Sequence, residues 1–127
     1  MSERVAAEKD PHSQRRIPSA WRGTLSAIVD AIRENDIQLA RGIAGVPTLP
    51  ERTARAIKGN IEGYGARLIS LPEDAWSTSA CQWMGSYWDV LVDLFTEKEG
   101  ASDLVLSVRV RESSAGYLFD VVSVHVP

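Results

Sequence analysis

Apolar residues recur at helical spacing in the first half of the chain. Residues 19–34 carry one apolar stripe, with charged residues mostly on the opposite side. A shorter segment, 37–44, shows similar spacing and ends at Gly45 and Pro47. A third run opens at "TLPE", where Thr48 and Glu51 have the spacing of a capping box, and it continues to about residue 64. The pattern therefore predicts three helices.

From about residue 79 onward the spacing changes to the alternation of β-strands. Two alternating runs between 88 and 110 are separated by a short polar segment, as in a hairpin. Pairing Val92 with Leu106, and Val90 with Val108, brings both apolar rows onto one face. This register sets Asp89 opposite Arg109 and Phe95 opposite Asp103. It leaves residues 98–100 as a loop in which Gly100 supplies the left-handed residue.

A last strand over residues 116–127 is placed by its apolar residues in the same way. This matching pairs Val110 with Leu118 and Leu106 with Val122, and it sets Asp103 opposite His125. Asp120 then falls on the apolar face. Three interpretations stay open: a bulge in the strand, a bond from Asp120 to a helix end, or a different register.

Together these elements predict an α+β fold, in which three N-terminal helices pack on a curved antiparallel sheet of about four strands in a cone-like arrangement. The chain has 127 residues, enough for one domain, expected over 19–127. Residues 1–18 are polar, contain Pro11 and Pro18, and lack apolar periodicity. We expect them to form a flexible N-terminal tail.

The charge, the single cysteine and the lack of known motifs argue against several classes of function. The net charge of −3 argues against a nucleic-acid binder, which is usually basic. Cys81 is the only cysteine, so neither an intrachain disulfide nor a multi-cysteine metal site is expected. No histidine spacing indicates a metal site, and no glycine-rich loop indicates a phosphate-bearing cofactor. Without an apolar leader or a membrane-length apolar run, the sequence predicts a cytoplasmic protein that does not enter a membrane.

The second face of the predicted sheet mixes acidic, aromatic and basic residues, which is typical of a binding surface. Its expected binding residues, together with a nearby tryptophan, are Trp83, Tyr87, Asp89, Asp93, Asp103 and Arg109. Asp103 could also orient the imidazole of His125 as a catalytic base, but no nucleophile motif accompanies this pair.

The stretches "YWDVLVDLFTEKEGASDLVLSVRV" and "YGARLISLPEDAWSTS" resemble a small family of uncharacterised bacterial domains over about residues 20–127. That resemblance brings no catalytic residues with it. The expected architecture is also similar to cone-shaped folds of the cystatin and nuclear-transport-factor-two type. Those folds host isomerases, dehydratases, ligand carriers and toxin-immunity proteins, so the likeness leaves function open.

Our leading hypothesis is a non-enzymatic binding module, such as an immunity-type protein that neutralises a basic toxin. Small size, acidic balance and the lack of a catalytic motif favour it. One alternative is a small-molecule or enzymatic site in a pocket lined by Trp83, Tyr87, Asp103, Arg109 and His125. Another is a homodimer joined through the open sheet face.

Overall fold

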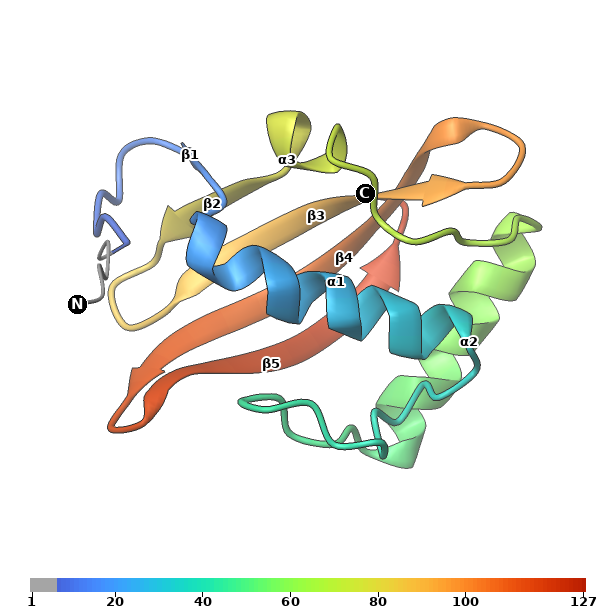
Figure 1. Ribbon diagram of the computed structural model, residues 1–127, viewed down its shortest axis with the longest axis horizontal. Coiled ribbons are helices and arrows are strands. Elements are labelled where there is room, and N and C mark those ends of the chain that lie inside the picture. The colour runs from blue at the N-terminus through green and yellow to red at the C-terminus, as the bar shows by residue number, and fades with distance from the viewer. Residues whose placement is uncertain (1–6) are drawn as a thin grey trace.

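The computed structural model describes residues 7–127, which form a five-stranded antiparallel sheet with helices around it (Figure 1). The helices are α1 (Ser19–Arg33), α2 (Glu51–Tyr64) and the single turn α3 (Ala75–Thr78). The strands are β1 (Arg15–Arg16), β2 (Ala80–Trp83), β3 (Trp88–Thr96), β4 (Gly100–Ser113) and β5 (Gly116–His125). Each strand pairs with the next along the chain. The expected helix-and-antiparallel-sheet architecture is present, but the sheet has five strands rather than about four.

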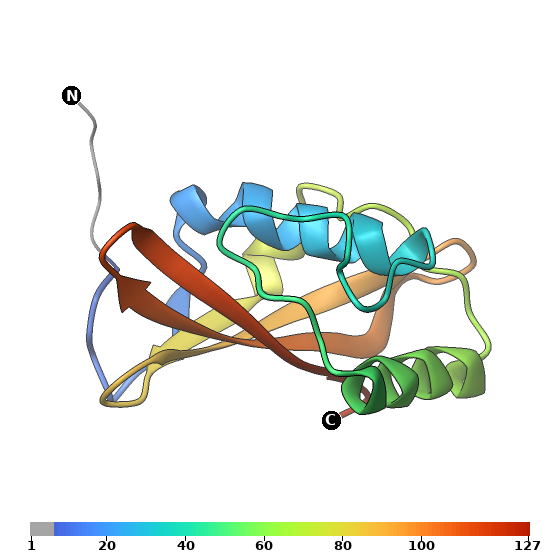
Figure 2. The ribbon, with the colours of Figure 1, turned by 90° about the horizontal axis from the view of Figure 1, so that it is seen from below.

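Helix α1 runs across one face of the sheet, called the inner face below (Figure 2). Its predicted stripe is confirmed, because Trp21, Leu25 and Ile28 are all buried. The Trp21 ring packs edge-on against Trp88 of β3, with centroids 5.3 Å apart. Aromatic pairs in this geometry stabilise a core beyond their buried area. The inner-face residues of β3 and β4 complete one hydrophobic cluster with α1.

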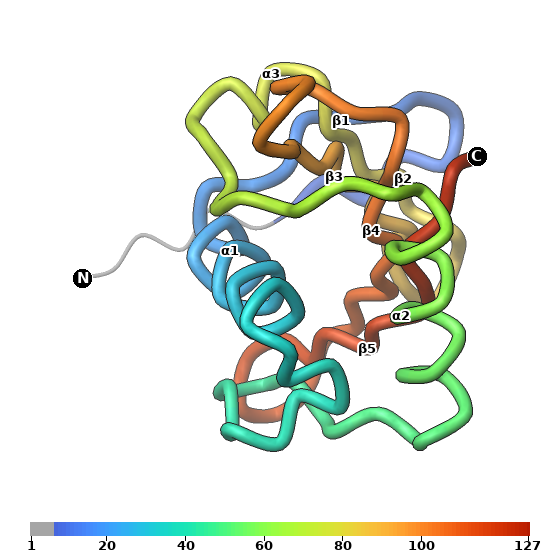
Figure 3. Tube along the Cα trace, turned by 90° about the vertical axis from the view of Figure 1, so that its right-hand side faces the viewer, coloured from blue at the N-terminus to red at the C-terminus, as the bar shows by residue number. Residues whose placement is uncertain are grey.

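The prediction of a second helix over residues 37–44 is wrong, because this segment is a loop. The Asp36 carboxylate accepts hydrogen bonds from the backbone N–H groups of Ala40, at 3.0 Å, and Arg41, at 3.1 Å. Such side-chain bonds compete with helical backbone bonds. Leu39 is fully buried in a left-handed conformation with φ of 59°, so its apolar spacing reflects core packing in a loop. Figure 3 shows this segment as a loop between α1 and α2.

Helix α2 lies at one end of the sheet (Figure 1). Its Asn60 amide donates to the carbonyl oxygen of Val124, at 2.9 Å, and fixes it to β5. The Thr48–Glu51 capping box is wrong: Pro50 occupies the N-cap position and no side-chain bond caps this end. At the other end Gly65, with a φ of 80°, is the left-handed C-cap residue. The third helix is α3, after α2, and β1 precedes α1, so the helices are not all N-terminal to the sheet.

The central hairpin has the predicted register over most of its length. Val92 pairs with Leu106, and Asp89 lies opposite Arg109, as expected. Near the tip the register shifts, so Phe95 pairs with Ala101 rather than with Asp103. The connection is consequently residues 97–99 instead of 98–100. Gly100 has the predicted left-handed conformation, with a φ of 72°.

The predicted register of β5 is wrong. Val110 pairs with Phe119, and Leu106 pairs with Val124. The two ends of this ladder differ in register because a bulge leaves Val122 as an extra residue. The bulge also explains Asp120, which points away from the core and forms an ion pair with Arg111, at 2.8 Å.

Residues 1–6 of the expected tail lie outside the described residues, whereas 7–18 run along the edge of the sheet. Arg15 pairs with Cys81 of β2, which makes β1 a short edge strand. The side chain of Ile17 is 1% exposed and belongs to the core cluster. The indole N–H of Trp88 donates to the carbonyl oxygen of Glu8, at 2.9 Å. A buried isoleucine and two backbone pairs therefore fix this segment to the domain.

Candidate functional site

The sheet surface that faces away from α1, called the outer face below, is the candidate site. Alternation along each strand sends every second side chain to this side. The half-exposed or exposed residues of its centre are Tyr87, Asp89, Leu91, Asp93, Ser107, Arg109, Arg111, Asp120 and Ser123. In Figure 2, α1 lies on the opposite side of the sheet, and α2 lies only at its right-hand end. The centre of the outer face is therefore open to a partner.

Two carboxylates on β3 are the most distinctive charges of this face. Asp89 and Asp93 form no ion pair among the described residues, and Leu91 between them is 39% exposed. Arg109 lies opposite Asp89 in the ladder, but its guanidinium stacks over the Tyr87 ring, 4.8 Å from the centroid. Such a cation–π contact is worth about 0.5–1 kcal/mol at an exposed site. The two carboxylates stay available to an outside cation.

Two further charges of the outer face, Arg111 and Asp120, pair with each other. Arg111 approaches the carboxylate of Asp120 with two nitrogens, at 2.8 and 3.0 Å. Both nitrogens contact the same oxygen, Oδ2, and these charge-assisted contacts hold the two side chains in place. Among the described residues, the unpaired charges at the centre of the outer face are the two β3 carboxylates and the stacked Arg109, which gives this centre an acidic balance.

The structure brings only part of the predicted binding set together. Tyr87, Asp89, Asp93 and Arg109 share the outer face. Trp83 is on the inner side, where its ring packs on Trp88 with centroids 4.7 Å apart. Lys9 from the N-terminal segment lies over the same Trp83 ring, at 5.1 Å. Trp83 is thus an edge of the core rather than a neighbour of the two carboxylates.

The expected Asp103–His125 pair does not form, because β5 has a different register. His125 lies opposite Val105, and its Nδ1 is 2.7 Å from the Ser123 hydroxyl. Asp103 is exposed near the hairpin tip, where its backbone N–H donates to the Tyr64 hydroxyl, at 3.1 Å. The residues expected to line a shared pocket are therefore spread over both faces and both ends of the sheet.

The remaining candidate groups are metal ligands and the Cys81 thiol. In the described part of the chain, no group of three or more His, Cys, Asp or Glu residues is placed to hold a metal ion. Burial raises the pKa of the Cys81 thiol to about 11, which disfavours the nucleophilic thiolate. Its Sγ lies 3.6 Å from the carbonyl oxygen of Arg16, so it packs under the N-terminal segment. From residue 7 onward, no helix is long and apolar enough to cross a membrane.

Sequence reasoning missed a separate groove between α1 and α2, lined in part by Ile37, Lys58 and Arg67. Ile37 was assigned to a helix that does not form, and the two cations look like ordinary solvated charges in the sequence. Only the tertiary fold brings them together, because the groove is lined by the end of α1, the loop after it, α2 and the segment after α2. An unpaired lysine one turn from an isoleucine on a predicted amphipathic helix was the available signal, and it is too common to be specific.

A protein-family model described as a domain of unknown function (DUF7668) matches residues 29–127. The matched region contains α2, α3, the strands β2 to β5 and the last residues of α1. No curated protein and no solved structure shows significant similarity to the chain.

Proposed function

The chain belongs to this family of domains of unknown function, and we propose that it is a non-enzymatic protein-binding module whose outer face receives a basic protein. One observation carries the proposal. Asp89 and Asp93 flank the exposed Leu91 on a sheet face that no helix covers at its centre, and neither carboxylate has a counter-ion among the described residues.

The geometry sets what the partner must present. Alternate residues of a strand lie about 6.7 Å apart, so the Cα atoms of Asp89 and Asp93 are separated by roughly 13 Å, with Leu91 midway. A complementary surface offers two cations at this spacing and an apolar side chain between them. Tyr87, held by Arg109 at 4.8 Å, supplies a preoriented aromatic contact beside Asp89. An aromatic ring with restricted motion loses little entropy when it is buried.

Charge favours a basic partner. The chain has 17 acidic and 14 basic side chains, and the free carboxylates of the outer face concentrate part of this excess. Complementary potentials accelerate encounter and discriminate against partners of like charge. A toxin that acts on nucleic acid has a basic surface, so an immunity-type protein that covers such a surface is the biological form we propose. The cytoplasm, where such toxins act, is the location that belongs to this proposal.

The test is affinity capture with three tagged proteins from lysate of the source cell. We compare the natural chain with Asp89→Lys/Asp93→Lys and with the control Glu73→Lys/Asp74→Lys. The control makes the same change of charge on another part of the surface, at exposed residues that form no ion pair within residues 7–127. We expect a stoichiometric basic protein with the natural chain and the control, and at least a roughly tenfold loss with the β3 variant.

Equal recovery of the same partner with all three proteins would refute the assignment of the surface. Thermal melting of each variant verifies that the fold is retained. Light scattering tests self-association, the other expected use of this face. If the natural chain is a dimer and the β3 variant is a monomer, the partner of this face is a second copy of the chain and not a basic protein.

A second candidate function is small-molecule binding beside His125. An open hollow of about 450 Å³ lies there between α2 and the ends of β4 and β5. Gly59 and Gly63 form its helix side, and the Ser123 hydroxyl lies 2.7 Å from His125 Nδ1. Thermal-shift screening of the natural chain against His125→Ala tests it. A ligand that stabilises both proteins equally would exclude His125 from its site.

A further inference from the structure

A groove separates the C-terminal end of α1 from α2 and continues on both sides of Ile37. Its first part has a volume of about 230 Å³ and its second about 360 Å³. The two parts share Asn35, Ile37 and Lys58, so they form one continuous depression. The floor of the first part is apolar and is made of Ile32, Ile37, Ile61 and Leu68.

Two of the cations around this groove have no carboxylate partner among the described residues. Lys58 projects from α2 and Arg67 from the segment that follows it. Glu62 also lines the groove, but no cation of the described chain pairs with it. The second part adds Arg55, which is already paired with Glu51 at 3.2 Å. Among the described residues, the two unpaired cations outnumber the unpaired carboxylate of Glu62, so the groove combines an apolar floor with a net positive charge from its unpaired groups.

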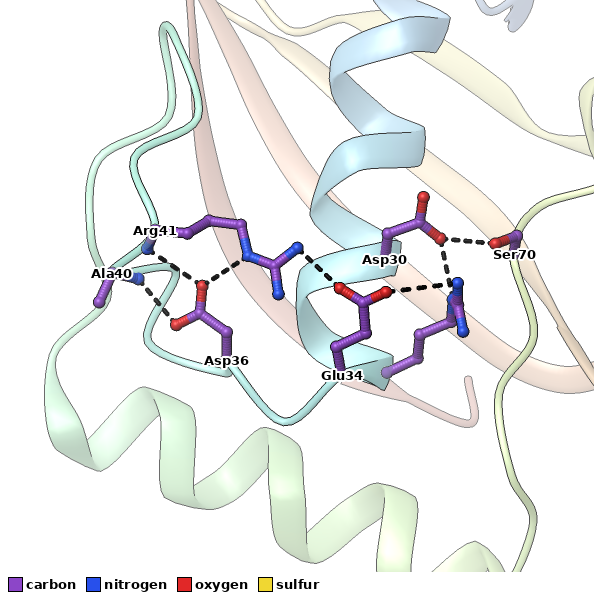
Figure 4. Close-up of polar contacts among 7 residues, drawn as sticks. Asp30, Glu34, Asp36, Ala40, Arg41 and Ser70 are labelled. Atoms are coloured by element: carbon purple, nitrogen blue, oxygen red, sulfur yellow. Dashed lines mark hydrogen bonds and ion pairs between the residues drawn. The ribbon is translucent and has the colours of Figure 1, made fainter.

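The carboxylates at the C-terminal end of α1 are held by an ion network (Figure 4). Arg41 donates to Asp36 at 3.0 Å and to Glu34 at 2.8 Å. Arg33 donates to Asp30, which also accepts from the Ser70 hydroxyl at 2.7 Å. These carboxylates are committed to other groups. They cannot also neutralise the two rim cations, and they hold the loop wall of the groove in one conformation.

Hydrogen bonds from backbone N–H groups also stabilise the ionised Asp36 carboxylate and hold its loop in place. The N–H groups of Ala40 and Arg41, together with the Arg41 guanidinium, lower the pKa of the Asp36 carboxyl below its ordinary value. Asp36 therefore stays ionised at neutral pH and keeps its three donors. The loop that carries Ile37 is thus positioned before any ligand arrives, which reduces the entropic cost of binding.

We propose that this groove binds a small amphipathic carboxylate, with its apolar chain over Ile37 and Ile61 and its carboxylate between Lys58 and Arg67. The apolar floor requires a hydrophobic body, and the free cations require an anionic head. Pockets for drug-sized ligands have volumes of about 300–1000 Å³, so the smaller first part fits a short chain. The site lies away from the outer face and is independent of the function proposed for that face.

The test uses octanoate as the probe and octylammonium as its counterpart of opposite charge. Amide resonances of the natural chain are followed by NMR while each probe is added. We expect saturable shifts with octanoate at Asn35, Ile37 and Lys58, and no saturable shift there with octylammonium. Equal binding of the two probes, or octanoate shifts confined to other residues, would overturn the proposal.

Charge variants provide the matched comparison. Lys58→Glu/Arg67→Glu reverses both rim cations, and Arg52→Glu/Lys98→Glu makes the same change of charge at exposed cations outside the groove. We expect octanoate affinity to fall by about tenfold or more in the first variant and by less than about twofold in the second. Unchanged affinity in the rim variant refutes the carboxylate site. The comparison of the two probes on the natural chain stays decisive if that variant does not fold.

Discussion

Replacing Ile17 with alanine tests whether the N-terminal segment belongs to the fold. The sequence places Ile17 in a polar tail, whereas the structure buries it to 1% exposure in the core cluster of α1 and the sheet. Removing the outer carbons of a buried isoleucine costs the transfer free energy of those carbons and leaves a cavity. We expect Ile17→Ala to lower the free energy of unfolding by about 2–4 kcal/mol.

Urea unfolding followed by tryptophan fluorescence measures this change, since Trp21 and Trp88 are buried in the same cluster. The control is Val126→Ala near the C-terminus, where the side chain is 51% exposed and about 0.5 kcal/mol or less should be lost. A loss below about 0.5 kcal/mol for Ile17→Ala as well would refute the burial of this segment. The segment would then be a tail that leaves the core unchanged.

Three further predictions concern the loop after α1 and the buried thiol. Gly45 has a φ of 79°, and an added Cβ would lie 2.9 Å from the Tyr117 carbonyl oxygen; Gly45→Ala should therefore cost about 2 kcal/mol or more. Gly42→Ala, at a φ of 85° but in open space, should cost only about 1 kcal/mol, and equal losses in urea unfolding would contradict the close approach. Folding lowers the pKa of Asp36 below 3.8, so its stabilisation is present above that pH and is lost as the pH falls through the lower pKa of the folded state. The melting temperature of Asp36→Ala should accordingly lie below that of the natural chain at pH 7 and approach it at pH 3. The same difference at both pH values would show that the ionised carboxylate is not the source of the stabilisation. Because the pKa of Cys81 is raised from 9.0 to about 11, its alkylation at pH 8 should be about a hundredfold slower in the folded protein than in urea, and equal rates by mass spectrometry would place the thiol at the surface.

The central hairpin could be predicted because its information is local. Alternation fixed which residues of β3 and β4 share a face, and the short loop fixed how they pair, so Val92 and Leu106 were matched correctly. The stripe of α1 was predictable for the same reason, since helical spacing and burial agree in Trp21, Leu25 and Ile28.

The errors arose where side-chain bonds or distant contacts decide the structure. The apolar spacing of 37–44 resembles a helix, but the Asp36 carboxylate takes the backbone N–H groups that a helix would use. The register of β5 depends on a bulge at Val122, which no alternation pattern specifies. β1 exists because Ile17 fits a core built by residues far along the chain.

The candidate site was predicted in part for the same reasons. Tyr87, Asp89, Asp93 and Arg109 lie on or beside the correctly paired hairpin, and they meet on one face. His125 depended on the misplaced β5 register and is separated from Asp103. The groove beside Ile37 was not predictable, since its lining comes from α1, the loop after it, α2 and the segment after α2, which only the tertiary fold brings together.

The most direct test of the central proposal is site-specific photo-crosslinking from the outer face in living source cells. A photoreactive residue at Leu91 reports any protein that lies over the exposed centre of β3, and the same residue at Glu73 is the control on another part of the surface. We expect one discrete crosslinked product from position 91, containing a basic protein, and none from position 73. No product from position 91, or the same product from both positions, would contradict a binding surface on the outer face.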